Sequence, residues 1–83
     1  MLIEEVIAKV FWVPAADVSD HSSHRTIPRW DSLGHISLIL ELERQYGILL
    51  SPQDALGATD VAAIKKLLRR YGVSNDAIAI PGA

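Results

Sequence analysis

The chain is short, slightly acidic and without cysteine, and these properties exclude several classes of function. It has 83 residues, with eight Lys and Arg against ten Asp and Glu, for a formal net charge of -2. A chain of this size forms one domain with no room for a deep catalytic cleft, and its charge balance argues against binding a nucleic-acid backbone. Without cysteine there is neither a disulfide nor a cysteine-based metal site, so any thiol must come from an attached group.

Hydrophobic residues make up 49% of the sequence and are spread along it, as in a folded domain. No apolar run is long enough to cross a bilayer. The first ten residues contain Glu4 and Glu5 and no long apolar core, unlike a signal peptide. We therefore expect a soluble, cytoplasmic domain that acts as a monomer.

The first predicted helix carries apolar residues at the spacing of one helical face between Ile3 and Val10, and Pro14 stops it. From Pro14 to Arg29 the sequence has no period, and only Val18 and Ile27 are candidate anchors to a core. This stretch predicts a long ordered loop, and loops of this length inside a domain are often functional.

The second predicted helix runs from Leu33 to Tyr46 and is apolar over more than half of its circumference. Such a helix is expected at the centre of a bundle, with Leu40 facing the core or a space that shields a short cargo. Gly47 is a natural stop for it. The narrow polar stripe that remains is the surface available to partners, and it contains Gly34, Ser37, Glu41, Arg44 and Gln45.

Two further helices are predicted after Gly47. Ser51 followed by Pro52 is a helix start, which gives a short third helix ending near Leu56. Thr59 or Asp60 can cap the last helix. Its apolar face consists of Val61, Ile64, Leu67, Leu68 and Tyr71.

Together these elements predict an all-α fold, a bundle of three longer helices plus one short helix, with the long loop between the first and second helices. Residues 1–72 would form the domain, closed by Gly72, and residues 73–83 a flexible C-terminal tail.

The chemistry is expected at Asp31-Ser32-Leu33, where the most apolar helix begins. Serine is a preferred N-cap residue, so one interpretation is that Ser32 only caps this helix and that the chain is a non-catalytic docking module. The tripeptide alone would favour that interpretation, because short motifs occur often by chance.

The order of elements around this tripeptide favours another interpretation. A helix, a long loop, Trp30-Asp31-Ser32-Leu33 opening a second helix, a short third helix and a final amphipathic helix resemble the acyl and peptidyl carrier proteins. The resemblance covers residues 3 to 71. It is also carried by Ile27 before the motif, by Leu38, Leu40 and Leu42 along the second helix, by Glu43, Tyr46, Gly47 and Ile48 at its exit, and by Val61 and Ile64 in the last helix.

This resemblance implies that the Ser32 hydroxyl is joined by a phosphodiester to 4′-phosphopantetheine, donated by coenzyme A through a magnesium-dependent phosphopantetheinyl transferase. A phosphate at a helix N-terminus agrees with that site. The thiol of the arm would hold an acyl or aminoacyl cargo as a thioester. Asp31 would help the transferase to recognise the site, and Leu33 would offer an apolar contact beside the arm.

The protein would then be a carrier and not an enzyme. It would receive cargo from a loading enzyme and deliver it to a transferase or synthase, because a tethered cargo reaches a high effective concentration. Gly34, His35 and Ser37 stand where fatty-acid carriers have acidic residues, which favours a specialised biosynthetic pathway. We expect partners to dock on Gly34, Ser37, Glu41 and Arg44, with Leu33 at the edge, mainly through shape and apolar contact.

Other candidate sites have simpler explanations. Ser32 and His35 are close enough on a helix for a nucleophile and base, but no nucleophile elbow or oxyanion hole accompanies them. We expect His35 to be partly buried and bonded to the loop. His21 and His24 lack further metal ligands, so no metal site is expected.

The tryptophans and the basic residues of the last helix complete the candidates. Trp30 should pin the loop against the bundle, whereas Trp12 lies off the apolar stripe and should be exposed. Four cations on the polar side of the last helix predict a solvated face rather than a nucleic-acid site. They are Lys65, Lys66, Arg69 and Arg70.

Overall fold

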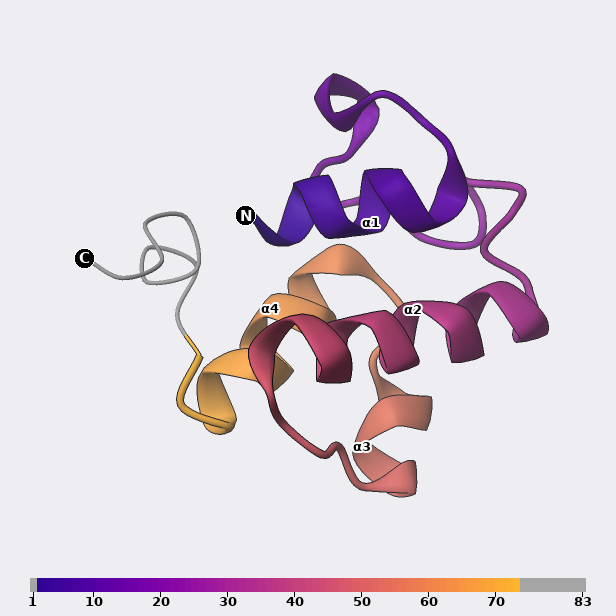
Figure 1. Cartoon of the computed structure of the whole chain (residues 1–83). Helices are drawn as coiled ribbons and strands as arrows, with labels where there is room; N and C mark the ends of the chain where they lie inside the picture. The colour runs from indigo at the N-terminus through magenta and orange to yellow at the C-terminus, as the bar shows by residue number, and fades with distance from the viewer. Residues whose placement is uncertain (1, 74–83) are drawn as a thin grey trace.

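Four α-helices and one 3-10 turn, joined by loops, lie within residues 2–73, the part of the chain that this computed structural model describes (Figure 1). The elements are α1 (Ile3–Phe11), η1 (Ala15–Asp17), α2 (Ser32–Tyr46), α3 (Pro52–Gly57) and α4 (Val61–Arg70). No strand occurs within these residues. The predicted all-α bundle with one short helix and a long first loop is confirmed.

The predicted tail falls almost entirely outside the described residues. Of residues 73–83 only Val73 is described, and it packs against the hydrophobic core. Ile78 and Ile80, the apolar residues of that tail, lie outside the described part of the chain.

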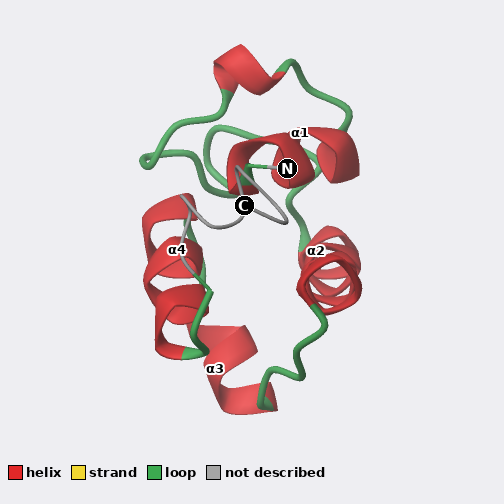
Figure 2. Ribbon diagram, turned by 60° about the vertical axis from the view of Figure 1, so that its left-hand side comes forward, coloured by secondary structure: helices red, strands yellow, loops and turns green. Residues whose placement is uncertain are grey.

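The core lies between helices that surround it on several sides. Figure 2 shows α2 and α4 on opposite sides, with α1 across one end and α3 at the other. The buried face of α1 consists of Ile3, Val6, Ile7, Ala8 and Phe11, and that of α4 of Val61, Ile64, Leu67 and Leu68.

Local signals set the helix ends. Trp12 closes α1 in the left-handed conformation, with φ of 59°, and Gly47 closes α2 with φ of 63°. At the other ends, Asp60 Oδ1 accepts the Ala63 N–H at 2.7 Å, so Asp60 and not Thr59 caps α4. Ser51 Oγ accepts the Asp54 N–H at 3.2 Å and caps α3, as predicted.

The long loop is ordered because its backbone is bonded to the start of α4. The carbonyl oxygens of Asp20 and Ser22 accept the N–H groups of Ala62 and Val61 at 3.1 and 3.0 Å. Val18 and Ile27 are buried, as predicted. The η1 turn within this loop was not predicted.

One lysine connects three parts of the fold. Lys65 Nζ lies 2.6 Å from Glu4 Oε2 in α1 and 2.6 Å from Asp20 Oδ1 in the loop. Burial by itself would lower the pKa of Lys65, but the hydrogen bonds to Asp20 and Glu4 raise it. The prediction that Lys65 belongs to a merely solvated face is therefore wrong, because this ammonium is paired and largely covered.

Of the two positions predicted for Leu40 of α2, the core is wrong. Only Leu38, Ile39 and Leu42 of this helix are buried, whereas Leu40 is 60% exposed and so does not face the core. The physical reason is that α1 covers one face of α2 and the six-residue α3 is too short to cover the rest. Three apolar side chains that share a second face are exposed, namely Leu33, Ile36 and Leu40.

Gly34 lies on the packed face of α2 and not in the predicted partner stripe. A Cβ atom at Gly34 would lie 2.1 Å from the Arg29 carbonyl oxygen and 2.9 Å from the Phe11 ring. Only glycine lets the loop backbone and α1 approach α2 this closely.

We expect Leu42→Ala to lower the free energy of unfolding by about 2 to 5 kcal/mol, because Leu42 is completely buried and its loss leaves a cavity. Leu40→Ala is the matched control in the same helix, and its effect should be about 0.5 kcal/mol or less. Urea titrations of both variants provide the measurement. Equal losses in the two would contradict this orientation of α2.

Candidate functional site

The N-terminus of α2 is capped by Asp31. Its Oδ1 accepts the Gly34 N–H at 2.7 Å, and its backbone is extended, with φ of -94° and ψ of -168°. These are the features of an N-cap residue. Ser32 is therefore the first residue inside the helix.

The Ser32 side chain takes no part in the hydrogen bonds that hold the start of α2. Its side chain is exposed, and within residues 2–73 its hydroxyl makes no hydrogen bond. The interpretation that Ser32 caps α2 is wrong, because two adjacent residues of cap-forming type compete and the backbone selects Asp31. The hydroxyl is consequently accessible at the first turn of α2.

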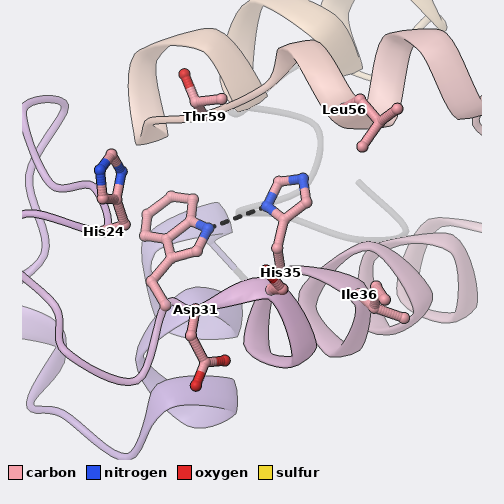
Figure 3. A pocket seen from close by; sticks show the side chains of 8 residues that line it. His24, Asp31, His35, Ile36, Leu56 and Thr59 are labelled. Atoms are coloured by element: carbon pink, nitrogen blue, oxygen red, sulfur yellow. Dashed lines mark hydrogen bonds between the residues drawn. The ribbon is translucent and has the colours of Figure 1, made fainter.

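A cavity of about 400 Å³ opens beside Ser32 (Figure 3). It lies between the end of the loop, the first turn of α2 and the segment from α3 to α4. In Figure 3 the Asp31 carboxylate is directed away from His24 and Thr59, which lie across the cavity. The lining residues are His24, Trp30, Asp31, Ser32, His35, Ile36, Leu56 and Thr59.

Trp30 holds the segment before Ser32 in place. Its indole is 3% exposed and stacks on Phe11 of α1, with 5.2 Å between ring centroids and 25° between planes. Its Nε1–H donates to His35 Nδ1 at 3.0 Å. The prediction that Trp30 pins the loop against the bundle is confirmed.

His35 is half-buried and bonded through both ring nitrogens. Nδ1 accepts from Trp30, and Nε2 lies 2.7 Å from the carbonyl oxygen of Ala55 in α3. The expected bond to the loop is present, and the bond to α3 is an addition that sequence spacing does not reveal. His35 therefore has no nitrogen left to act as a base toward Ser32.

A second, apolar groove of about 290 Å³ separates α2 from α3. Leu40 lines it, so this residue faces a space between helices although it is not in the core. The groove shares His35, Ile36 and Leu56 with the cavity beside Ser32. Its lining consists of His35, Ile36, Ile39, Leu40, Pro52, Ala55 and Leu56.

The exposed surface of α2 is more apolar than predicted. Leu33 is 76% exposed, and Ser37 and Arg44 are also exposed, as the predicted stripe requires. Glu41 is half-buried beneath Arg44, whose Nη2 lies 2.6 Å from Glu41 Oε2, and this pairing lowers the pKa of Glu41. Ile36 and Leu40 were missed as surface residues, although the excess width of the apolar arc was a signal for them.

The possible metal ligands and Trp12 complete the candidates. Within the described residues no three His, Cys, Asp or Glu side chains could share a metal ion. Trp12 is exposed, as predicted, with the Arg29 guanidinium 5.9 Å from its ring centroid. No described helix has the length and apolar character needed to span a bilayer.

Comparison with known proteins adds no assignment, since neither a protein-family model nor a curated protein matches the chain. The candidate site therefore stands on its own geometry.

We expect Asp31→Ala to destabilise the fold by about 1 kcal/mol, because it removes the cap of α2. Ser32→Ala should change the free energy of unfolding by about 0.5 kcal/mol or less, since its hydroxyl bonds to no described residue. Denaturant titration of the two variants measures this difference. A larger loss in Ser32→Ala than in Asp31→Ala would show that Ser32 is the cap after all.

Proposed function

We propose that the chain is an acyl or aminoacyl carrier protein with 4′-phosphopantetheine on Ser32. The observation that carries this proposal is the position of Ser32: an exposed hydroxyl with no hydrogen bond to the described residues, one residue after the cap and at the edge of a cavity. An exposed hydroxyl in this position is accessible to a transferase. The loop and the cap Asp31 fix the backbone around Ser32 without a hydrogen bond to its hydroxyl.

The proposed modification is a transfer from coenzyme A. The Ser32 oxygen attacks the phosphorus on the pantetheine side of the pyrophosphate, forming a new phosphodiester bond. The bond to the nucleotide breaks, adenosine 3′,5′-bisphosphate leaves, and the serine proton passes to a base of the transferase. The attached group then supplies the terminal thiol that this cysteine-free chain lacks.

Asp31 is suited to assist recognition without moving. Its Oδ1 is bonded to Gly34, yet the side chain is exposed, so a partner can read the carboxylate while it still caps α2. A positive group of the transferase, including a bound magnesium ion, would be attracted to it. Asp31 and Ser32 thus form one recognition element whose spacing the cap fixes.

The exposed apolar face of α2 supports docking by a partner enzyme. Leu33, Ile36 and Leu40 follow one another along this face, and Leu56 of α3 is also exposed. The opposite charges of Glu41 and Arg44 neutralise each other. A partner would therefore gain more from apolar burial than from charge.

The same face would also serve a docking module that carries no cofactor, which is the second candidate function. That candidate depends on the apolar surface alone, and it gives Ser32 and the adjoining cavity no use. Covalent modification separates the two.

Incubation with coenzyme A, magnesium and a broad-specificity phosphopantetheinyl transferase should raise the intact mass by one phosphopantetheine group. Ser32→Ala should remain at its sequence mass while keeping its helical circular dichroism spectrum. Ser19→Ala, at an exposed serine of the loop outside the predicted docking surface, is the control and should be modified like the wild type. A folded wild type that several transferases leave unmodified would favour the docking module.

Docking to a cognate loading enzyme should depend weakly on salt, because exposed charges are screened beyond about 8 Å at physiological ionic strength and few contribute here. Leu33→Ala should weaken binding more than Glu41→Gln does. Leu49→Ala, at an exposed leucine outside α2, is the control for a general loss of apolar surface. Affinities at low and high salt measure this. A steep salt dependence that Glu41→Gln abolishes would overturn apolar docking.

A further inference from the structure

One histidine connects the segment before Ser32 to the short helix α3. Its Nδ1 accepts from the Trp30 indole at 3.0 Å, and its Nε2 lies 2.7 Å from the Ala55 carbonyl oxygen. Trp30 immediately precedes the cap Asp31. The hydrogen-bonded chain therefore runs from α3, through His35, to the residue beside the cap of α2.

The partners determine the protonation of this histidine. An indole N–H can only donate and a carbonyl oxygen can only accept. His35 must then be neutral, with its proton on Nε2 donated to Ala55 and a lone pair on Nδ1 directed at Trp30. Both partners are satisfied in this one state of the ring.

We propose that His35 is a positioning residue for Ser32, whose neutral Nε2–H form holds Trp30, and through it the cap Asp31, in place. This inference rests on the proposed function in one respect, that Ser32 is the residue to be modified. The positioning itself concerns only groups that the structure shows.

Protonation of the ring should release one of its two bonds. An imidazolium carries N–H groups at both nitrogens, so its Nδ1–H would point at the indole N–H of Trp30. Two donors cannot bond, whereas the Nε2–H bond to Ala55 persists. Acid should therefore free the Trp30 side of the chain and leave the α3 side intact.

Few titratable or charged groups lie near His35. His24 from the loop and Asp31 from the cap line the same cavity as His35. From α3 the nearest charged residue is Asp54, next to Ala55, whose carboxylate accepts from Tyr71 at 2.9 Å and lies 3.6 Å from Arg70. A pH-dependent shift of the Trp30 indole resonance must accordingly be compared with the ring resonances of both His24 and His35.

The structure also explains why α3 needs this contact. No residue of α3 is fully buried. The start of α3 is held by Tyr71, whose hydroxyl accepts the Ser51 N–H at 3.2 Å and donates to Asp54. The bond from His35 to Ala55 holds the middle of α3. It thereby keeps Leu56 where it lines both the cavity beside Ser32 and the groove between α2 and α3.

Two substitutions separate the bonds of His35. In His35→Asn the side-chain oxygen lies near the position of Nδ1, so it can still accept from Trp30 but does not reach Ala55. In His35→Gln the amide N–H₂ group lies near the position of Nε2, so it can donate to Ala55 while the acceptor for Trp30 is lost. Neither side chain titrates, and circular dichroism checks that each variant folds.

The first measurement is NMR of the unmodified chain from about pH 8 to pH 5, the range in which histidine ordinarily titrates. In the wild type, protonation of His35, as its ring resonances report it, should shift the Trp30 indole N–H and lower the protection of the Gly34 amide against exchange several-fold relative to the intrinsic rate at the same pH. The exposed Trp12 indole is the internal reference. His35→Asn should show neither change, and His35→Gln should show low protection of the Gly34 amide at every pH.

The second measurement is the rate of Ser32 modification over the same pH range. The ratio of the wild-type rate to that of His35→Asn cancels the pH profile of the transferase itself. This ratio should be near one at pH 8 and fall several-fold as the pH is lowered. At low pH it should approach the ratio of the His35→Gln rate to the His35→Asn rate. If no variant is modified, the proposed function fails while NMR still decides the role of His35.

Two results would overturn the proposal. One is a Trp30 indole and Gly34 amide that do not respond when His35 titrates, including a response that follows His24 instead. The other is a wild-type to His35→Asn ratio that stays constant with pH although the chain is modified. Should His35→Asn fail to fold, the wild type at low pH and His35→Gln still provide the comparison.

Discussion

The burial of the Trp30 indole is the interaction on which the rest of the site depends. A long loop with few apolar residues has little free energy of its own to hold a shape. Stacking on Phe11 and a bond to His35 fix its end against both α1 and α2. Asp31 follows Trp30 directly, so this contact also fixes the position of the cap. The cap in turn positions the first turn of α2 and the Ser32 hydroxyl.

The helices themselves follow from local signals that a sequence displays. The 3.6-residue period of α1 and α4, Ser51 with Pro52 before α3, and Gly47 after α2 each act within a few residues. Their effects do not depend on distant contacts, which is why these elements and the all-α class could be predicted. Even the loop anchors Val18 and Ile27 stand out, because they are isolated apolar residues in a polar stretch.

The faces of α2 could not be predicted in the same way. An apolar arc shows that a helix can be buried on several sides, but not which sides have a neighbour. Leu40 is exposed because α3 is short, and Gly34 is packed because the loop backbone crosses it. The choice between Asp31 and Ser32 as the cap is similar, since both residue types cap helices and only the backbone decides.

The cap also bears on where a modified Ser32 would place its arm. The carboxylate of Asp31 already occupies the positive end of α2, so a phosphodiester on the next residue would meet a like charge as well as the helix dipole. At about 4 Å such a repulsion is worth about 1 kcal/mol in water, comparable to the attraction of the dipole. The helix end would then hold the phosphate only weakly. On the proposed function this balance is useful, because an arm that is not bound to its own protein is free to reach a partner's active site.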